Sequence, residues 1–271
     1  MIRGGVSHGA LSPCCGGAST ERGGYIWERA CRPFSLAARS GTHKLNLVTC
    51  ELNQRVFLLS PAYAGGERAR MVMSEGAQFN LARRLRSKRG ATIAEVFTFL
   101  SGLYFRGKIA YANVFARPFA RSSGVFVITP TRGLLEARTR INLGALREFA
   151  KVDIDEGDPR YRKPLERDMQ SLARKLSEQS EVVLLGSIAT GKYVDVLLAN
   201  FGERLRFPAD FVGRGDMSRG GLLLRCAADH DELRYISVAG AVLNGKRPPK
   251  LTPRRYPKSA DSMTASRGMA V

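Results

Sequence analysis

A glycine-rich loop with a lysine is the sequence feature most typical of phosphate chemistry. Gly186, Gly191 and Lys192 fit the spacing G-x-x-x-x-G-K, in which backbone amides hold phosphate oxygens and the lysine reaches the terminal phosphates. A Ser or Thr should follow to hold Mg²⁺, but Tyr193 stands there, so a degenerate P-loop phosphotransferase ranks below a looser phosphate contact. Capping of a helix by Thr190 is the structural alternative. The contact residues predicted from this loop are Ser187, Thr190, Gly191 and Lys192.

Polar loops rich in glycine and hydroxyl groups follow four apolar runs. The loops are residues 60–66, 129–133, 186–192 and 210–216. The carboxyl ends of parallel strands meet at one edge of a sheet, where open α/β folds bind ligands, so we expect the four loops to line one site. Turn formation alone is the alternative, because turns use the same residue types. The further ligand-contact candidates are Ser60, Tyr63, Gly65, Gly66, Thr129, Arg132 and Arg214.

Two aspartates in residues 207–221 are the candidates for catalytic proton transfer. Asp210 and Asp216 alternate with glycines and with Arg214 and Arg219. No histidine lies near this edge, so carboxylates are the groups left for acid–base chemistry. A structural ion pair between the same Asp and Arg residues is an equal alternative. The glycines favour a mobile loop or a site over a regular element.

The charge distribution favours a polyanionic partner. The chain has 43 Lys and Arg against 24 Asp and Glu, a net charge of +19, and residues 66–121 alone hold eleven basic and three acidic residues. A local positive excess with interleaved aromatic residues is typical of nucleic-acid backbone binding. The aromatic residues, at near-helical spacing, are expected to pack in the core, and binding to a membrane surface is a lesser alternative. The predicted nucleic-acid contacts are Arg83, Arg84, Arg86, Lys88 and Arg89.

The sequence predicts no metal and no cofactor. It has three scattered histidines and five cysteines without a C-x₂-C pair, a poor ligand supply for zinc. It also has no apolar run long enough to span a membrane, and no apolar stretch of a secretory signal follows Arg3. We therefore expect a cytoplasmic protein with reduced cysteines; its protein partners stay open.

The elements that must position these residues alternate along about 200 residues. Apolar runs at 55–59, 124–129, 181–186, 204–208 and 233–238 predict strands. Helical patterns cover 67–73, 77–88, 93–115 with a break near Gly102 or Gly107, 143–151, 164–178 with Pro164 in its first turn, and 194–200. This alternation predicts an α/β fold of three layers, with a largely parallel central sheet of about five strands, helices on both faces and a basic helical insertion after the first strand.

Composition divides the chain into three parts. Residues 1–53 are rich in Gly, Ser, Arg and Cys without a sustained period, and residues 251–271 are rich in Pro, Arg and Ser. Both are expected to be disordered. Residues 54–250 are expected to form a single α/β domain, in which 66–121 is the basic helical segment.

Two segments resemble YaaA-like proteins and related uncharacterised Rossmann-like α/β domains. They are GVFVITPTRGLL (124–135) and VVLLGSIATGKYVDVL (182–197), which share with that family a strand, a small polar turn with Gly-Leu-Leu, and a later strand before a Tyr-containing helix. The resemblance implies an α/β fold, a basic surface and DNA association in a stress context. It transfers no catalytic residue.

Together these features predict a soluble α/β protein that binds a phosphate-bearing ligand, nucleic acid or nucleotide, at the carboxyl edge of its sheet. The alternative from another class is a nucleotide or nucleoside hydrolase or transferase, which needs the same edge without the basic segment. A purely structural or interaction role would leave the loops without a pocket. The sequence leaves open whether the protein is an enzyme.

Overall fold

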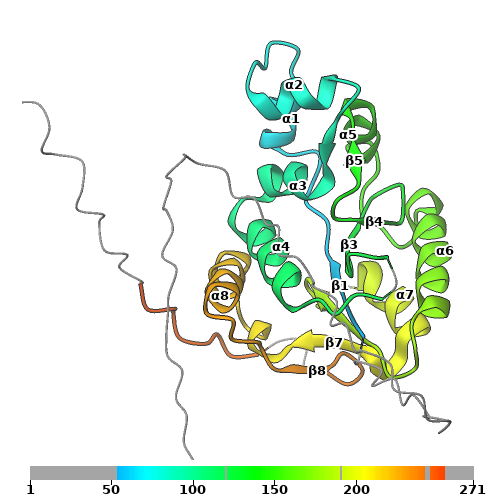
Figure 1. Cartoon of the computed structure of the whole chain (residues 1–271), viewed down its shortest axis with the longest axis vertical. Helices are drawn as coiled ribbons and strands as arrows, with labels where there is room; N and C mark the ends of the chain where they lie inside the picture. Colours follow the sequence, from blue (N-terminus) through cyan, green and yellow to red (C-terminus); the bar gives the residue numbers. More distant parts are fainter. Residues whose placement is uncertain (1–53, 120, 190, 242–244, 254–271) are drawn as a thin grey trace, which may run out of the picture. The chain divides into compact units, whose positions relative to one another are not determined.

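The computed structural model of the protein describes residues 54–119, 121–189, 191–241 and 245–253 (Figure 1). The predicted extension 1–53, residues 254–271 of the predicted tail and Thr190 lie outside the described residues. The described part contains one of the five cysteines, Cys226, whose thiol is free and buried.

A six-stranded sheet in the order β4-β3-β1-β6-β7-β8 forms the centre of the described domain. The strands are β1 (Arg55–Leu59), β3 (Val125–Ile128), β4 (Leu134–Glu136), β6 (Glu181–Leu185), β7 (Leu205–Pro208) and β8 (Tyr235–Ser237). β1 pairs in parallel with β3 and β6, and β6 pairs in parallel with β7, whereas the edge strands β4 and β8 are antiparallel to their neighbours. The predicted α/β fold with a largely parallel sheet is confirmed.

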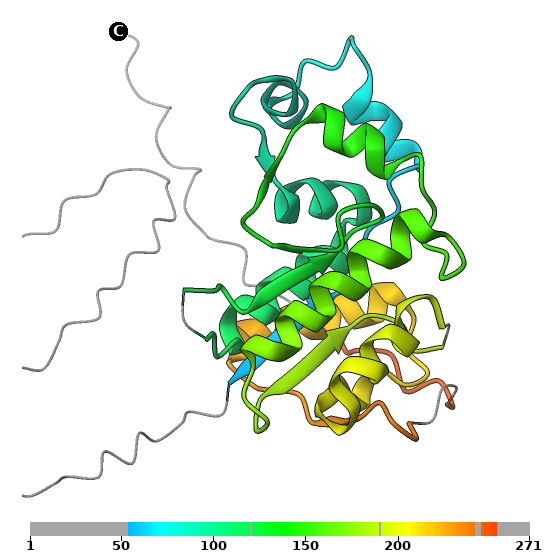
Figure 2. The same cartoon turned by 90° about the vertical axis from the view of Figure 1, so that its right-hand side faces the viewer.

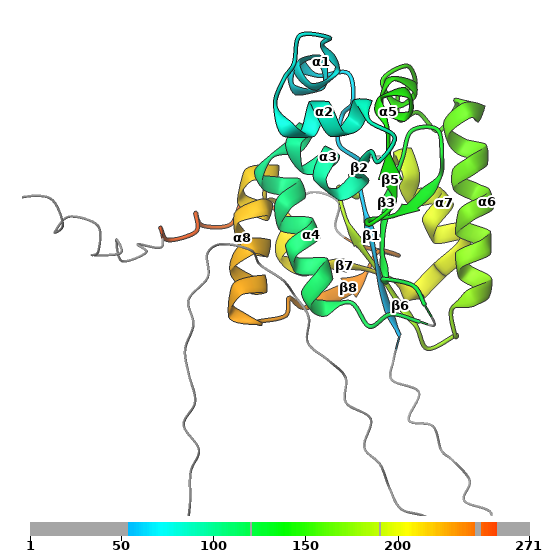
Figure 3. The same cartoon turned by 45° about the horizontal axis from the view of Figure 1, so that its top comes forward.

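Helices cover both faces of this sheet, so the predicted three layers are confirmed as well. In Figure 3, α4 and α8 lie on one side of β1, and α6 and α7 lie on the other; Figure 2 shows α6 (green) and α7 (yellow) across that second face. The helices are α1 (Glu67–Met73), α2 (Asn80–Arg86), α3 (Ile93–Ser101), α4 (Leu103–Phe115), α5 (Leu143–Phe149), α6 (Pro159–Lys175), α7 (Gly191–Phe201) and α8 (Asp216–Asp229), with short 3₁₀ helices η1 (Gly202–Arg204) and η2 (Ala209–Phe211).

The central strands are apolar along their length because both of their faces are covered. Val56, Phe57, Leu58 and Leu59 in β1 are fully buried, and four consecutive residues of β6 (182–185) are buried beside them. The sheet therefore holds the loops that follow β1 and β6 at fixed, neighbouring positions.

The basic insertion predicted after the first strand comprises α1 to α4. Its helical pattern breaks at Gly102, one of the two predicted positions, where φ is +64°, in a region that L side chains rarely adopt. A second sheet of two strands, β2 (Ala91–Thr92) and β5 (Arg140–Ile141), accompanies α1, α2 and α5 beyond the carboxyl end of β1 (Figure 1).

One helix begins earlier than its sequence predicted. The expected start at Pro164 was wrong, because α6 begins at Pro159 and contains Pro164 in its interior. The Asp158 carboxylate accepts a hydrogen bond from the Arg160 amide at 2.8 Å. This N-cap and a proline in the first turn together form a strong helix start.

Residues 207–221 are predicted to form a mobile loop or a site; the mobile loop is wrong from Asp216 onward, because those residues form the first turns of α8. Gly220 faces α4, and a Cβ added to it would lie 2.8 Å from Cα of Tyr104. At Gly220 the absent side chain therefore permits close helix packing. The strand β4 was also not expected; Gly133, at φ +58°, makes the turn that returns the chain beside β3.

Candidate functional site

The loops after β1 and β6 leave the sheet toward opposite faces. The chain runs from β1 through Ser60 into α1 to α4, and from β6 through Gly186 into α7. In open α/β sheets this divergence creates the crevice in which ligands bind. A cavity of about 530 Å³ lies here. We call it the Ser60 pocket; it is lined by Ser60, Pro61, Ala62, Tyr63, Gly66, Glu67, Arg68, Ala69, Leu100, Ser101, Tyr104, Lys108, Ser187, Tyr193 and Asp216.

A buried lysine lies against the first residue after β1. Lys108 of α4 is 2% exposed, and its Nζ lies 2.7 Å from Ser60 Oγ and 3.1 Å from the Ser60 carbonyl oxygen. Among the described residues, no carboxylate forms an ion pair with it. Burial lowers the pKa of Lys108 to about 7, against a smaller opposite effect of Asp216. The amine is therefore neutral in about half of the molecules at pH 7 and in most of them about one pH unit higher.

Gly186 allows the ends of β1 and β6 to approach. A Cβ added to it would lie 2.8 Å from both Ser60 Cβ and Tyr193 Oη. The Tyr193 hydroxyl accepts a hydrogen bond from the Ser187 amide at 3.1 Å and donates one to the Ser187 carbonyl at 2.9 Å. These bonds fix the β6–α7 turn against Ser60.

Tyr104 supplies an aromatic wall beside the lysine. The Lys108 Nζ lies 4.1 Å from the centroid of its ring. The Tyr104 hydroxyl is buried without a hydrogen-bond partner in the described part of the chain, and burial raises the pKa of this phenol. Burying a hydroxyl without a partner is costly.

The rim of the Ser60 pocket carries charge of both signs. Arg68 is exposed and donates a hydrogen bond to the Phe99 carbonyl at 3.2 Å, while Glu67 and Asp216 supply carboxylates. Tyr63 is 72% exposed and offers a ring at the mouth. The rim therefore offers a ligand one cation, two carboxylates and an aromatic ring.

Of the predicted ligand contacts, Ser60, Tyr63, Gly66 and Ser187 line this pocket, as does Asp216 of the predicted acid–base pair. Gly65 lies between Tyr63 and Gly66 in the chain. Its missing side chain leaves room for the Tyr63 hydroxyl, which would be 2.7 Å from an added Cβ.

Asp210 and Arg214 do not line the Ser60 pocket. The Arg214 guanidinium donates to the Asp210 carbonyl at 2.9 Å and to the Pro249 carbonyl at 3.4 Å. In this arrangement Arg214 holds the turn before α8 against the segment at residues 245–253.

The end of the G-x-x-x-x-G-K loop also lies apart from this pocket. Lys192 is exposed in the first turn of α7 and is not among the lining residues. A Cβ added to Gly191 would lie 3.0 Å from Asp195 Oδ2 and 3.2 Å from Glu156 Oε2. Two carboxylates beside this turn disfavour a phosphate there.

The loop after β3 is used for a turn and an ion pair. Thr129 is fully buried; its Oγ1 accepts from the Arg132 amide at 3.1 Å and donates to the Gly133 carbonyl at 3.0 Å. The Arg132 guanidinium pairs with Glu148 at 2.6 Å, which lowers the pKa of that carboxyl.

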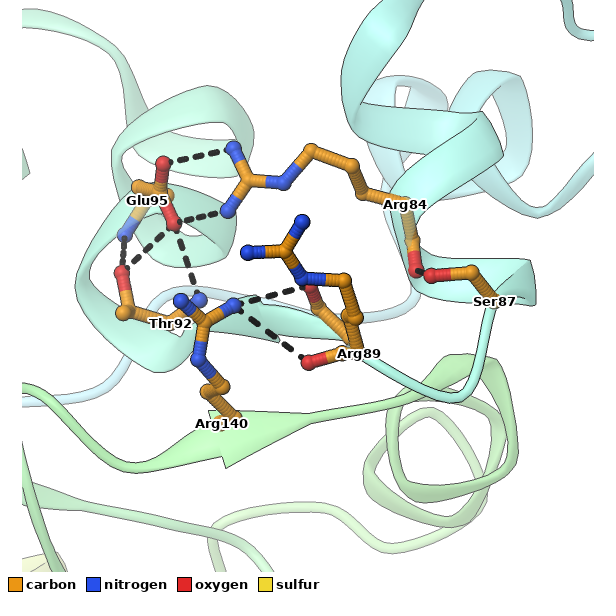
Figure 4. Close-up of polar contacts among 7 residues, drawn as sticks. Arg84, Ser87, Arg89, Thr92, Glu95 and Arg140 are labelled. Carbon is orange, nitrogen blue, oxygen red and sulfur yellow. Dashed lines mark hydrogen bonds and ion pairs between the residues drawn. The ribbon is translucent and has the colours of Figure 1, made fainter.

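A second, smaller concavity gathers positive charge. This cationic cavity of about 170 Å³ is lined by Lys88, Arg89, Gly90, Arg132, Arg140, Ile141 and Asn142. Arg140 Nη1 donates to the carbonyls of Arg89 and Gly90, both at 3.3 Å (Figure 4). The four cationic side chains come from three separate stretches of the chain.

Of the other predicted nucleic-acid contacts, Arg84 and Arg86 form hydrogen bonds within the protein, and Arg83 is exposed. Arg84 forms two hydrogen bonds of 2.8 Å with Glu95 (Figure 4), which help lower the pKa of Glu95 to about 2. Arg86 donates to the carbonyls of Ser74, Glu75 and Ala77, so it ties down the α1–α2 connection. Arg83 is exposed.

Sequence reasoning missed Lys108, Tyr104, Tyr193 and Arg68 as pocket residues. The signal for Lys108 was present, since it lies four residues after Tyr104 and three before Tyr111, on the face that the helical period assigns to the core. A lysine at a core-facing position is seldom without a role, because burying its charge is costly.

Comparison of the chain with protein-family models, curated proteins and solved structures finds no match. Within the described residues, no helix has the length and apolar character needed to cross a membrane. The same residues contain no group of three or more His, Cys, Asp or Glu side chains arranged to hold a metal ion.

Proposed function

We propose that the protein binds a phosphate-bearing small molecule of nucleotide size in the Ser60 pocket. The observation that carries the proposal is the position of this cavity at the carboxyl ends of β1 and β6, the customary ligand site of open α/β sheets. Its volume of about 530 Å³ falls within the roughly 300–1,000 Å³ typical of ligand pockets.

The chemistry of the lining supports this class of ligand. Arg68 provides a planar cation suited to phosphate oxygens. Tyr63 provides a ring on which a base can stack, and Ser60 and Ser101 provide hydroxyls for a sugar. We place the phosphate at the Arg68 rim, because Lys108 is too far buried to carry full charge at neutral pH.

A tryptophan at position 66 is expected to obstruct this pocket without straining the backbone. Gly66 has φ −79° and ψ 178°, which any residue adopts, and an added Cβ would meet only the Tyr63 ring, at 3.4 Å or more. Titration calorimetry with AMP, ADP, ATP, GTP and adenosine should show binding of a phosphate-bearing member, weakened at least ~10-fold by Gly66→Trp.

Gly76→Trp is the matched control, because Gly76 is exposed in the α1–α2 connection and has nothing within 4 Å of an added Cβ. It should bind as the native protein does. Absence of binding by the native protein, or equal binding by Gly66→Trp, would exclude the proposed function.

We propose polyanion binding at the cationic cavity as a second candidate function. The specific observation is the convergence of Lys88, Arg89, Arg132 and Arg140 on one concavity. The resemblance to YaaA-like proteins implies the same kind of DNA association. Phosphate contacts of this type position a nucleic acid without reading its sequence.

Duplex DNA of random sequence should therefore bind with a steep salt dependence. About four phosphate contacts predict a loss of affinity on the order of 100-fold between about 50 mM and about 200 mM salt. In fluorescence anisotropy, Lys88→Gln/Arg89→Gln should make the slope of log affinity against log salt shallower by about 1–2.

Lys163→Gln/Arg174→Gln is the control of equal charge, because both residues are exposed on α6 and neither lines the cationic cavity. Its slope should stay near the native one. A native affinity that scarcely changes with salt, or two double variants with the same slope, would contradict this second function.

A further inference from the structure

Ser60 and Lys108 make a close pair inside the Ser60 pocket. Lys108 Nζ lies 2.7 Å from Ser60 Oγ, within hydrogen-bonding reach for proton transfer. Both residues line the cavity of about 530 Å³, so a substrate in it would reach the serine hydroxyl. Ser60 directly follows β1, whose pairing on both sides with β3 and β6 fixes its position.

We propose that Ser60 is a nucleophile and Lys108 its general base, and that the protein transfers or hydrolyses the acyl group of an ester or another activated acyl compound. Serine–lysine pairs are a recognised variant of the serine nucleophile with an adjacent base. The inference rests on the Ser60 pocket being open to a substrate, as the proposed function requires, and is independent of whether that substrate is a nucleotide.

The surroundings of Lys108 keep its amine available as a base. Ser60 faces it from the loop after β1, Tyr104 and Phe105 from its own helix, and Asp216 and Arg219 are the charged groups of α8 that act on it. Burial has the largest effect and lowers the pKa of Lys108 to about 7, a value suited to a general base near neutral pH.

The reaction balances with these two groups and water. Ser60 Oγ bonds to the acyl carbon as its proton passes to Lys108 Nζ, and the leaving alkoxide then takes that proton from Lys108 as the carbon–oxygen bond breaks. Water next attacks the Ser60 ester and gives a proton to Lys108. The acid departs, and Ser60 Oγ recovers the proton from Lys108.

Labelling of the full chain by a fluorophosphonate probe tests this pair. Peptide mapping should find the probe on Ser60, with a rate that rises with pH about a midpoint near 7, the pKa at which Lys108 becomes neutral. Ser60→Ala should abolish the labelling, and Lys108→Met should slow it at least ~100-fold. Ser74→Ala, an exposed serine that does not line the cavity, should label at the native rate.

Three results would overturn the inference. The first is labelling of Ser60 no faster than of other serines in native protein, a comparison that needs no variant. The second is a Lys108→Met variant that circular dichroism shows to be folded and in which Ser60 is labelled at the native rate. The third is borohydride trapping of an aldehyde on Lys108 without labelling of Ser60, which would make the amine the nucleophile. Nucleotide binding in calorimetry would survive each of them, so the two proposals fail separately.

Discussion

Lys108→Met should raise the free energy of unfolding at pH 7 by on the order of 2 kcal/mol, because it replaces a buried amine without an ionic partner by an apolar side chain of similar length. The native protein holds this amine only partly charged at pH 7, since burial lowers its pKa to about 7 from 10.5. In the unfolded chain the same amine is protonated until about pH 10.5.

The sign of the pH dependence follows from proton counts. Between pH 7 and about 10.5 the unfolded state binds more protons at Lys108 than the folded state does, so the native protein gains stability from this group as pH rises. Lys108→Met lacks this gain. The difference in free energy of unfolding between Lys108→Met and the native protein should therefore fall by about 1 kcal/mol per pH unit between about pH 7.5 and 9.5.

Urea unfolding of both proteins across this range measures the effect, and Lys88→Met, a change of the same type at an exposed lysine, should show no such trend. A Lys108→Met variant that is less stable than native by the same amount at every pH would show that the lysine is charged and paired in the folded protein.

Gly220→Ala should destabilise the protein by on the order of 3 kcal/mol through the contact of α4 with α8. A Cβ added to Gly220 would lie 2.8 Å from Cα of Tyr104 and 2.9 Å from the Leu103 carbonyl carbon. Backbone atoms cannot rotate away as a side chain does, so the helices must separate. Helix propensity alone predicts the opposite sign, since alanine is favoured over glycine by about 1 kcal/mol.

Gly221→Ala is a stringent control because it is the next residue of the same helix. Its added Cβ meets only Leu251 Cδ1, at 3.5 Å, so the variant should equal or exceed the native stability. Denaturant unfolding of both variants measures the difference. Equal stability of Gly220→Ala and Gly221→Ala would refute the close packing that places α8, and with it Asp216, beside Tyr104 and Lys108.

The fold was predictable where local pattern and burial coincide. β1 and β6 are continuous apolar runs because helices cover both of their faces, and the helix break at Gly102 coincides with a positive φ. The start of α6 and the helical state of Gly220 were missed. The start of α6 is set by a capping aspartate, Asp158, in front of Pro159. The helical position of Gly220 is set by its contact with α4.

The candidate site was predictable only in part. The expectation that the loops after β1 and β6 share an edge follows from parallel pairing, and Ser60 and Ser187 line one cavity. Arg132 pairs with Glu148, and the turn at Gly191 lies beside Asp195 and Glu156; a spacing motif contains no information about such carboxylates. Lys108 lies on a helix that is distant from Ser60 in the sequence, so only the tertiary structure shows that the two residues are in contact.

Photolabelling tests most directly whether the Ser60 pocket is where the protein takes its ligand. Irradiation with 8-azido-ATP, followed by peptide mapping with and without excess ATP, should place ATP-protected label on peptides containing residues 60–69 or 101–108, which line this cavity. Protected label found only on peptides containing Lys192 or Arg140, or no protected label at all, would contradict the account.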